Sequence, residues 1–151
     1  MTQLTKDFNP GYQPRAADPR DVPFSAVFGG QSVQFGNGYD LSKKLVLKVE
    51  DQGQSLSCVA QAWSKYAEIK RKLTEGLPTD ASARDIYARI YIRDSGGAYG
   101  YKGGSILKVG VGREQDIPSY INGKPPTEDF MRQLRDPAVT GAHWHDRRHS
   151  C

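Results

Sequence analysis

A cysteine and a glutamine just upstream of it are the residues of this sequence best suited to chemistry. Cys58 is predicted to lie in the first turn of the longest helix, where backbone N–H groups lack intrahelical partners and the helix dipole is positive. Both effects favour the thiolate and lower the pKa of the thiol. The amide of Gln52 and the backbone N–H of Cys58 could together bind an oxyanion, as acyl transfer to sulfur requires. The alternative is that Cys58 is only a small buried hydrophobic residue at a helix start.

Apolar spacing and capping signals predict the elements that would hold these residues. An apolar stripe at spacings of three and four predicts a helix over 56–73. Ser82 with Asp85 has the pattern of a capping box and opens a second helix. The run 125–127, Pro-Pro-Thr, introduces a short third helix that Pro137 closes. The apolar residues assigned to these helices are Val59, Ala62, Trp63, Tyr66, Ile69 and Leu73, then Ile86, Tyr87 and Ile90, then Phe130, Met131 and Leu134.

Three other regions have different patterns. Residues 1–38 are rich in proline and glycine, which predicts an extended N-terminal arm whose apolar residues dock on the core. Residues 96–112 contain seven glycines, which predicts a loop with one short strand at 105–111. A β-prone run of apolar residues at 45–49 predicts another short extended segment.

The segment around Cys58 also resembles a known family. Residues 51–60, DQGQSLSCVA, are similar to the active-site segment of the papain-like cysteine peptidases (C1 family), whose pattern is close to QG-x-C-G-S-C-W-A. The resemblance implies that Cys58 is the nucleophile and that Gln52 belongs to the oxyanion hole. Residues 100–105, GYKGGS, are similar to the G-C-x-G-G loop of that family. This implies that Gly103 and Gly104 hold the substrate backbone.

Weaker matches and several departures accompany these motifs. The segments 18–21, 39–41 and 116–120 are similar to stretches found in members of the family. Ser55 and Tyr101 stand where members of the family have two cysteines that form a disulfide. Both partners of that disulfide are absent together, so neither is left as an unpaired thiol. Leu56 replaces the usual glycine, and Val59 replaces the aromatic residue after the nucleophile.

The resemblance implies an α+β, papain-like fold, but only part of it. The family's catalytic histidine lies roughly 130–150 residues after the cysteine, whereas 93 residues follow Cys58. We therefore expect mainly the helical left lobe, with the β-rich right lobe absent or truncated. The expected organisation is an extended arm at 1–38, a papain-like helical lobe at 39–137 and an irregular histidine-rich tail at 138–151.

The function implied is peptide-bond hydrolysis on a peptide or protein substrate, without a cofactor. The catalytic histidine and asparagine would come from elsewhere, for example from a complementing chain. One alternative is a non-catalytic remnant that binds peptides or partners through the same fold. Another is a small metal-binding protein that uses the tail residues His143, His145, His149 and Cys151.

Composition narrows the other classes of function. The 151 residues carry a formal net charge of +4 that is spread along the chain, so we expect no nucleic-acid partner. We find neither an apolar run of membrane-spanning length nor a secretory signal, which predicts a cytoplasmic protein with no membrane partner. Two cysteines, 58 and 151, give no sign of a disulfide framework.

Overall fold

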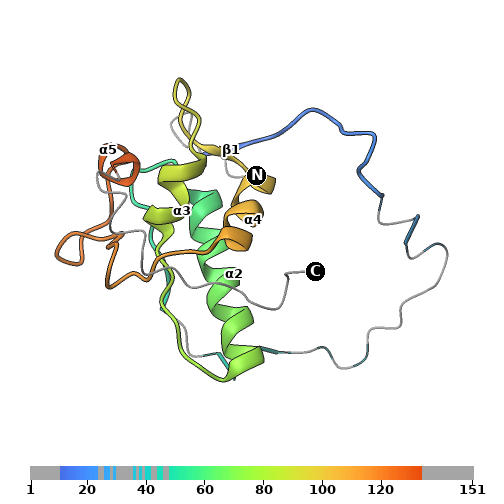
Figure 1. Ribbon diagram of the computed structural model, residues 1–151, viewed down its shortest axis with the longest axis horizontal. Coiled ribbons are helices and arrows are strands. Elements are labelled where there is room, and N and C mark those ends of the chain that lie inside the picture. Colours follow the sequence, from blue (N-terminus) through green and yellow to red (C-terminus); the bar gives the residue numbers. More distant parts are fainter. Residues whose placement is uncertain are drawn as a thin grey trace, which may run out of the picture. The chain divides into compact units, whose positions relative to one another are not determined.

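The computed structural model describes residues 11–23, 26–27, 29, 36, 38, 40–41, 44–45 and 48–133. They fall into two compact units, one formed by residues 11–14 and 49–133 and the other lying within 15–48. The boundary that the sequence predicts between the N-terminal arm and the lobe, at 38/39, falls inside the range of the second unit. In the first unit the described elements are β1 (Tyr12–Gln13), α2 (Cys58–Glu75), α3 (Ala83–Ile90), β2 (Ala98–Tyr99), α4 (Gly100–Val109) and α5 (Glu128–Arg132) (Figure 1).

The fold class is α+β, as predicted at this coarse level. The four described helices are the main regular elements of the first unit, and β1 and β2 form a two-stranded parallel sheet with Tyr12 opposite Ala98. Residues 12 and 13 of the predicted N-terminal arm pair with β2, and Gly11 is buried. The predicted docking of apolar side chains is wrong for the described apolar residues Tyr12, Val22 and Val27, which are 53%, 68% and 63% exposed. Of the predicted extended run at 45–49, Leu45 and Val49 are described and lie outside any strand, while residues 46 and 47 lie outside the described part.

The long helix α2 begins at Cys58 and buries a different face from the predicted apolar stripe. Its buried residues are Val59, Ala60, Gln61, Ser64, Ala67 and Glu68. Tyr66 and Leu73, both assigned to the buried stripe, are 49% and 50% exposed. The buried face includes the small side chains of Ala60, Ser64 and Ala67, and α2 packs against both α3 and α4. The face that α2 buries therefore follows from its packing against these helices rather than from its own apolar spacing.

Helix α3 begins as predicted, although only half of the capping box forms. Ser82 Oγ accepts a hydrogen bond from the backbone N–H of Asp85 at 3.1 Å. In a complete capping box the Asp85 side chain would accept a hydrogen bond from the Ser82 N–H. Here, however, the Ser82 N–H donates to the Gly112 carbonyl at 2.9 Å. The Asp85 carboxylate accepts from Arg89 and from the Gly112 N–H instead. The cap thereby joins the start of α3 to the segment that follows α4.

The glycine-rich region is the clearest correction to the sequence prediction. Residues 100–109 form α4, a ten-residue helix, where a loop and a strand were predicted. The β-branched residues of this segment favour a strand only weakly, because strand propensity depends on context. Here Ile106 and Leu107 pack on the helical core, and that burial stabilises the helix.

The short helix α5 follows its predicted signals. Thr127 is the N-cap, and its Oγ1 accepts a hydrogen bond from the Phe130 N–H at 3.3 Å. Met131 is fully buried and Phe130 packs against the same core. Leu134 and Pro137, assigned to the end of this helix, lie outside the described residues.

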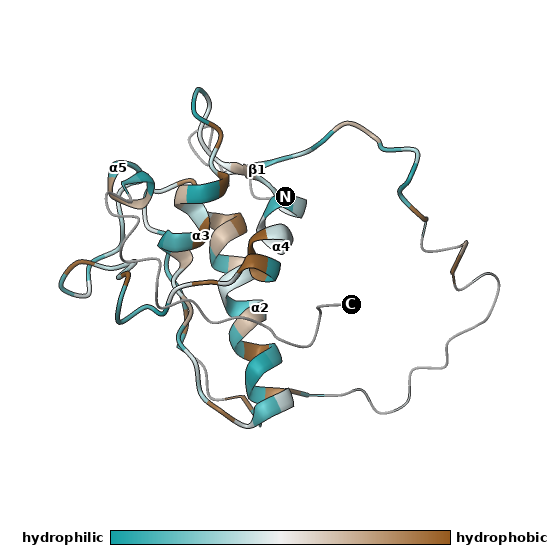
Figure 2. Cartoon of the chain, viewed as in Figure 1, coloured by the Kyte–Doolittle hydropathy of each residue, from teal (hydrophilic) through white to brown (hydrophobic). Residues whose placement is uncertain are grey.

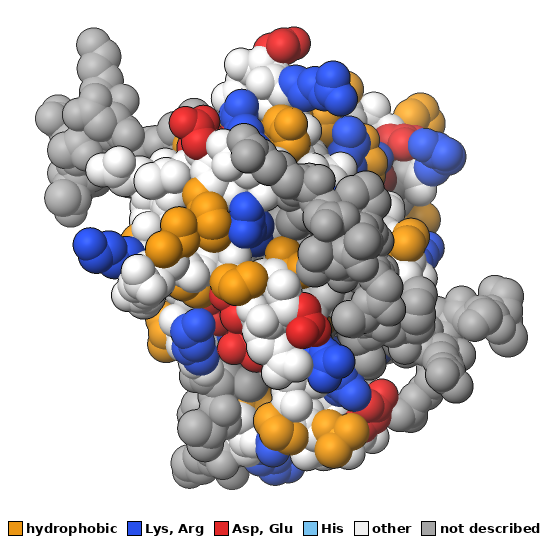
Figure 3. All heavy atoms as spheres, turned by 60° about the vertical axis from the view of Figure 1, so that its left-hand side comes forward, with side chains coloured by type: hydrophobic (Ala, Val, Ile, Leu, Met, Phe, Trp, Pro, Cys, Tyr) orange, Lys and Arg blue, Asp and Glu red, His pale blue; other side chains and the backbone are white. Residues whose placement is uncertain are grey.

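Several ion pairs in the described part of the chain join residues three or four positions apart. The last turns of α2 are largely hydrophilic (Figure 2), and Arg71 pairs there with Glu75 across one turn. On the face shown in Figure 3, acidic and basic side chains are interspersed. Among the described helices, none has both the length and the apolar character needed to cross a bilayer.

Candidate functional site

Cys58 is the first residue of α2 and carries a half-buried, free thiol. The residue before it, Ser57, is the N-cap but makes no side-chain capping bond. Ser55 Oγ donates to the Gln52 carbonyl at 2.7 Å, so its single proton is used. The Ser57 hydroxyl, 2.7 Å from Ser55 Oγ, must therefore be the donor between the two serines. The hydroxyl thus points toward the preceding loop and leaves the first turn of α2 without a side-chain cap.

The pKa of Cys58 moves in the opposite direction from the sequence prediction. Burial raises the pKa of the thiol above its ordinary value, while the backbone N–H groups of Val59 and of Cys58 itself act to lower it. Desolvation has the larger effect because it penalises the charged thiolate directly. The thiol is therefore the resting form at neutral pH.

Gln52 lies in the loop that leads into α2, as predicted, but its amide is engaged within that loop. Its Nε2 donates to the Ser55 carbonyl at 3.2 Å. A primary amide carries two N–H groups, so this contact uses one of them. The other is the donor that Gln52 could offer to an oxyanion.

The same loop is held by groups far away in the sequence. The Asp51 N–H donates to the Tyr120 hydroxyl at 2.9 Å, and that hydroxyl donates to Glu50. Burial and the neighbouring Glu50 carboxylate raise the pKa of Tyr120 well above its ordinary range. Tyr120 therefore remains a neutral hydroxyl that fixes the start of the loop.

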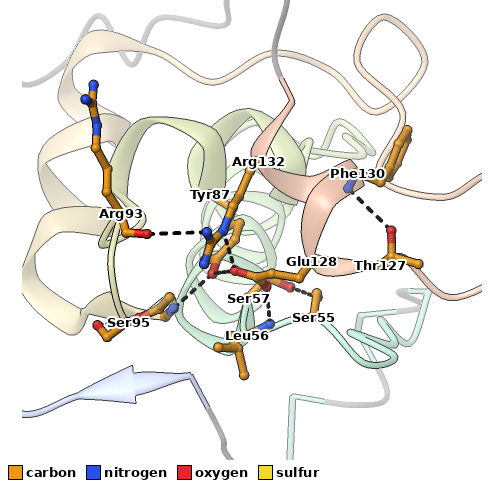
Figure 4. Close-up of polar contacts among 12 residues, drawn as sticks. Ser55, Leu56, Ser57, Tyr87, Arg93, Ser95, Thr127, Glu128, Phe130 and Arg132 are labelled. Atoms are coloured by element: carbon orange, nitrogen blue, oxygen red, sulfur yellow. Dashed lines mark hydrogen bonds and ion pairs between the residues drawn. The ribbon is translucent and has the colours of Figure 1, made fainter.

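The end of the loop is held by Glu128, a residue that was not predicted to belong to the site. Figure 4 shows its carboxylate between Leu56 on one side and Tyr87 and Arg132 on the other. Glu128 Oε2 accepts from the Leu56 N–H at 2.7 Å, although the two residues are 72 positions apart. Glu128 Oε1 accepts from Tyr87 Oη at 2.6 Å and from Arg132 Nε at 2.7 Å. Its place in the first turn of α5 was the only available signal.

Gly103 and Gly104 lie on α4, where Trp63 from α2 covers both of them. A Cβ on Gly103 would lie 2.1 Å from Trp63 Cδ1, and one on Gly104 would lie 3.0 Å from the edge of the same ring. The indole Nε1 donates to the Gly100 carbonyl at 2.7 Å. These glycines therefore make room for Trp63, a role that the motif alone did not indicate.

A group of acidic residues lies near the beginning of the loop. Within the described residues, Glu50, Glu68 and Asp80 place a carboxylate oxygen each within 4.8 Å of one another. The Lys65 ammonium donates to Glu50 at 3.2 Å and to Glu68 at 2.5 Å, so it already supplies a positive charge. Burial raises the pKa of Glu68 despite this partner. The arrangement is a partly buried ion-pair network in which Lys65 of α2 pairs with Glu68 of the same helix and with Glu50 of the loop, while Asp80 is exposed.

The tail residues of the metal-binding alternative, His143, His145, His149 and Cys151, lie outside the described residues. The described part of the chain consequently places no imidazole near Cys58. No family model, curated protein or solved structure matches the chain.

Proposed function

We propose that this chain carries the nucleophile-bearing helical lobe of a papain-like cysteine peptidase. The substrate is a peptide or protein, Cys58 attacks the carbonyl carbon, and the Cys58 N–H and the free N–H of Gln52 bind the resulting oxyanion. The observation that carries the proposal is the position of a free thiol at the first residue of an 18-residue helix, directly after a loop that contains Gln52.

The surroundings of the thiol support this assignment. Ser57 does not cap α2, and the backbone N–H groups of Cys58 and Val59 interact with the sulfur. The loop is anchored at both ends, by Tyr120 at Asp51 and by Glu128 at Leu56. A fixed loop holds hydrogen-bond donors in place before the reaction, which is what stabilisation of an oxyanion requires.

The raised pKa of Cys58 means that the thiol needs a base before it can attack. In the proposed reaction this base takes the thiol proton, the sulfur bonds to the carbonyl carbon, and the leaving amine departs with a proton. Water then releases the acyl group. The base would come from the part of the chain outside the described residues or from a complementing chain.

A second candidate is a non-catalytic module that binds peptides in the same place. Two observations favour it, the raised pKa of Cys58 and the contact between the Gln52 amide and its own loop. A module of this kind would retain the anchored loop and the helix start, but peptide binding would not require Cys58 to ionise.

Hydrolysis and binding of peptides separate these candidates. The full-length Cys151→Ser variant is assayed with a mixed fluorogenic peptide library, beside the Cys58→Ala/Cys151→Ser variant. Hydrolysis that disappears in the second protein supports the peptidase. Peptide binding without hydrolysis, equal in both proteins, supports the binding module. If the protein neither hydrolyses nor binds peptides, both candidates are contradicted.

A further inference from the structure

We propose that Glu128 is the positioning residue of the candidate site, and that its carboxylate sets the direction of the Cys58 N–H. The inference rests on the proposed function, because it assigns that N–H to the oxyanion hole. Glu128 does not touch the substrate in this proposal. It acts through the backbone of Leu56, two residues before Cys58.

The geometry around Leu56 carries the argument. Its N–H is held by Glu128 Oε2 at 2.7 Å. Its carbonyl is in such close contact with Gly11 that a Cβ on Gly11 would lie 2.1 Å from the Leu56 oxygen. Its side chain lies against Gly96, where a Cβ would come within 2.6 Å of Leu56 Cδ1. Leu56 is therefore fixed through its N–H, its carbonyl and its side chain, and of these three contacts the one at the N–H is a hydrogen bond donated to a side chain.

Glu128 is itself held in place. Tyr87 Oη and Arg132 Nε both donate to Oε1, and the Tyr87 hydroxyl in turn accepts from the Gly97 N–H at 3.0 Å (Figure 4). Burial and the hydrogen bond to Glu128 raise the pKa of Tyr87, so the hydroxyl keeps the proton that it donates. Three donors thus converge on one carboxylate, which is the acceptor-only group that such a position needs.

The link to Cys58 follows from the missing cap. In most helices an N-cap side chain would fix the first turn, but Ser57 makes no such bond. The entry angle of the chain into α2 therefore depends on the residues before Ser57. Of these, Leu56 is bound to Glu128, so the carboxylate replaces the cap as the group that fixes the start of the helix.

Glu128→Gln is the decisive substitution, since glutamine has only one amide oxygen. Tyr87 and Arg132 both require an acceptor at the position of Oε1, so the amide NH2 is forced against the Leu56 N–H. The matched control is Arg132→Gln, which removes a donor from Oε1 and leaves the bond from Leu56 intact. Both are made in the Cys151→Ser background.

Two reagents separate positioning from general damage. A peptide aldehyde adds to the thiol, with a new S–C bond and transfer of the thiol proton to the former carbonyl oxygen, and this oxygen lies where the oxyanion would lie. Iodoacetamide alkylates the same sulfur without using an oxyanion hole. We expect Glu128→Gln to weaken aldehyde binding roughly tenfold and to leave the iodoacetamide rate unchanged. We expect Arg132→Gln to preserve both the aldehyde affinity and the iodoacetamide rate. Equal aldehyde affinity in the Glu128→Gln variant and the parent would overturn the inference.

Amide hydrogen exchange in the parent protein tests the inference even if the Glu128→Gln variant does not fold or the proposed function is wrong. In the parent protein, the Leu56 amide is expected to exchange at least roughly tenfold more slowly than the Cys58 amide, because only the former has a hydrogen-bond partner outside its own turn. Unprotected exchange at Leu56 overturns the role of Glu128. A parent protein that binds no aldehyde, with Leu56 protected, instead contradicts the proposed function and leaves the anchoring by Glu128 supported.

Discussion

The indole of Trp63 lies against Gly103 so closely that a Cβ at this glycine would come within 2.1 Å of the ring. The same indole donates to the Gly100 carbonyl, one turn earlier in α4. Trp63 also contacts Tyr66 edge to face, with ring centroids 5.3 Å apart. One side chain of α2 therefore joins the two helices, and the glycines of α4 are the surface that receives it.

Gly103→Ala is expected to destabilise the protein even though alanine is the better helix former. Alanine favours a helix over glycine by about 1 kcal/mol. Overpacking against Trp63 costs about 1–3 kcal/mol, and the contact at 2.1 Å involves a ring atom close to the α2 backbone. The loss should exceed that of Gly104→Ala, whose Cβ would meet the outer edge of the ring at 3.0 Å. Urea unfolding measures both variants.

Gly36→Ala is the matched control, because nothing lies within 4 Å of its Cβ position. It should leave the free energy of unfolding unchanged within about 0.5 kcal/mol. A Gly103→Ala variant as stable as the unmodified protein would show that α4 can move away from Trp63.

Local signals predicted the beginnings of helices well. The position of Cys58 in the first turn of α2, the cap at Ser82 and the short helix after Thr127 all agree with the structure. The two caps depend on residues within about one turn of the helix start, where a side chain satisfies the same N–H groups in almost any fold. The start of α2, which has no side-chain cap, follows from the apolar spacing of its own residues. Such contacts can be identified without knowledge of the tertiary structure.

Contacts between distant segments were not predictable in this way. The face that α2 buries depends on where α3 packs, and the helical state of residues 100–109 depends on burial of Ile106 and Leu107. The bond between Leu56 and Glu128 spans 72 positions and has no local pattern. The pKa of Cys58 belongs to the same class, since desolvation of the thiol arises from the packing around it.

Ser82→Ala tests the cap that joins α3 to the segment after α4. Ser82 Oγ accepts from the Asp85 N–H and donates to the Ile117 carbonyl at 2.6 Å, and the residue is fully buried. Loss of both bonds should lower the free energy of unfolding by about 2 kcal/mol. Thr127→Ala removes a cap at an exposed position, so it should cost about 0.5–1 kcal/mol. Equal losses in the two variants, measured by thermal unfolding, would contradict a buried role for Ser82.

Asp85→Ala should be the most destabilising of these substitutions. The fully buried carboxylate accepts two hydrogen bonds from Arg89 Nη2, at 2.6 and 2.8 Å, and one from the Gly112 N–H at 2.7 Å. Removing one partner of a buried ion pair costs about 3–5 kcal/mol, because the remaining charge loses its compensation. Glu75→Gln breaks the pair with Arg71 near the surface, and such pairs contribute about 0–1 kcal/mol. A small loss for Asp85→Ala in urea unfolding would mean that solvent at Arg89, whose side chain is 21% exposed, compensates the charge that Asp85 no longer balances.

The pH dependence of Cys58 alkylation tests whether burial or a neighbouring base controls the thiol. In the Cys151→Ser variant, the iodoacetamide rate should rise at a higher pH for the folded protein than for the same protein in urea, because burial raises the pKa of the folded thiol. Between the two pKa values the folded state retains a proton that the unfolded state has lost. Stability contributed by the neutral thiol is therefore complete below the unfolded pKa and is lost as the pH rises through this interval.

Cys58→Ser provides the control for that linkage, since serine does not ionise in this range. The pH-dependent loss of stability should be smaller in Cys58→Ser by the amount that the thiol contributes. The opposite order of the two alkylation profiles, with the folded thiol ionising first, would contradict control by burial. It would mean either that the N–H groups at the start of α2 outweigh burial or that a cationic group from outside the described residues reaches the sulfur, because both lower a cysteine pKa. If exchanging His143, His145 or His149 for alanine then removed the shift, the base required by the peptidase would be identified in the same experiment.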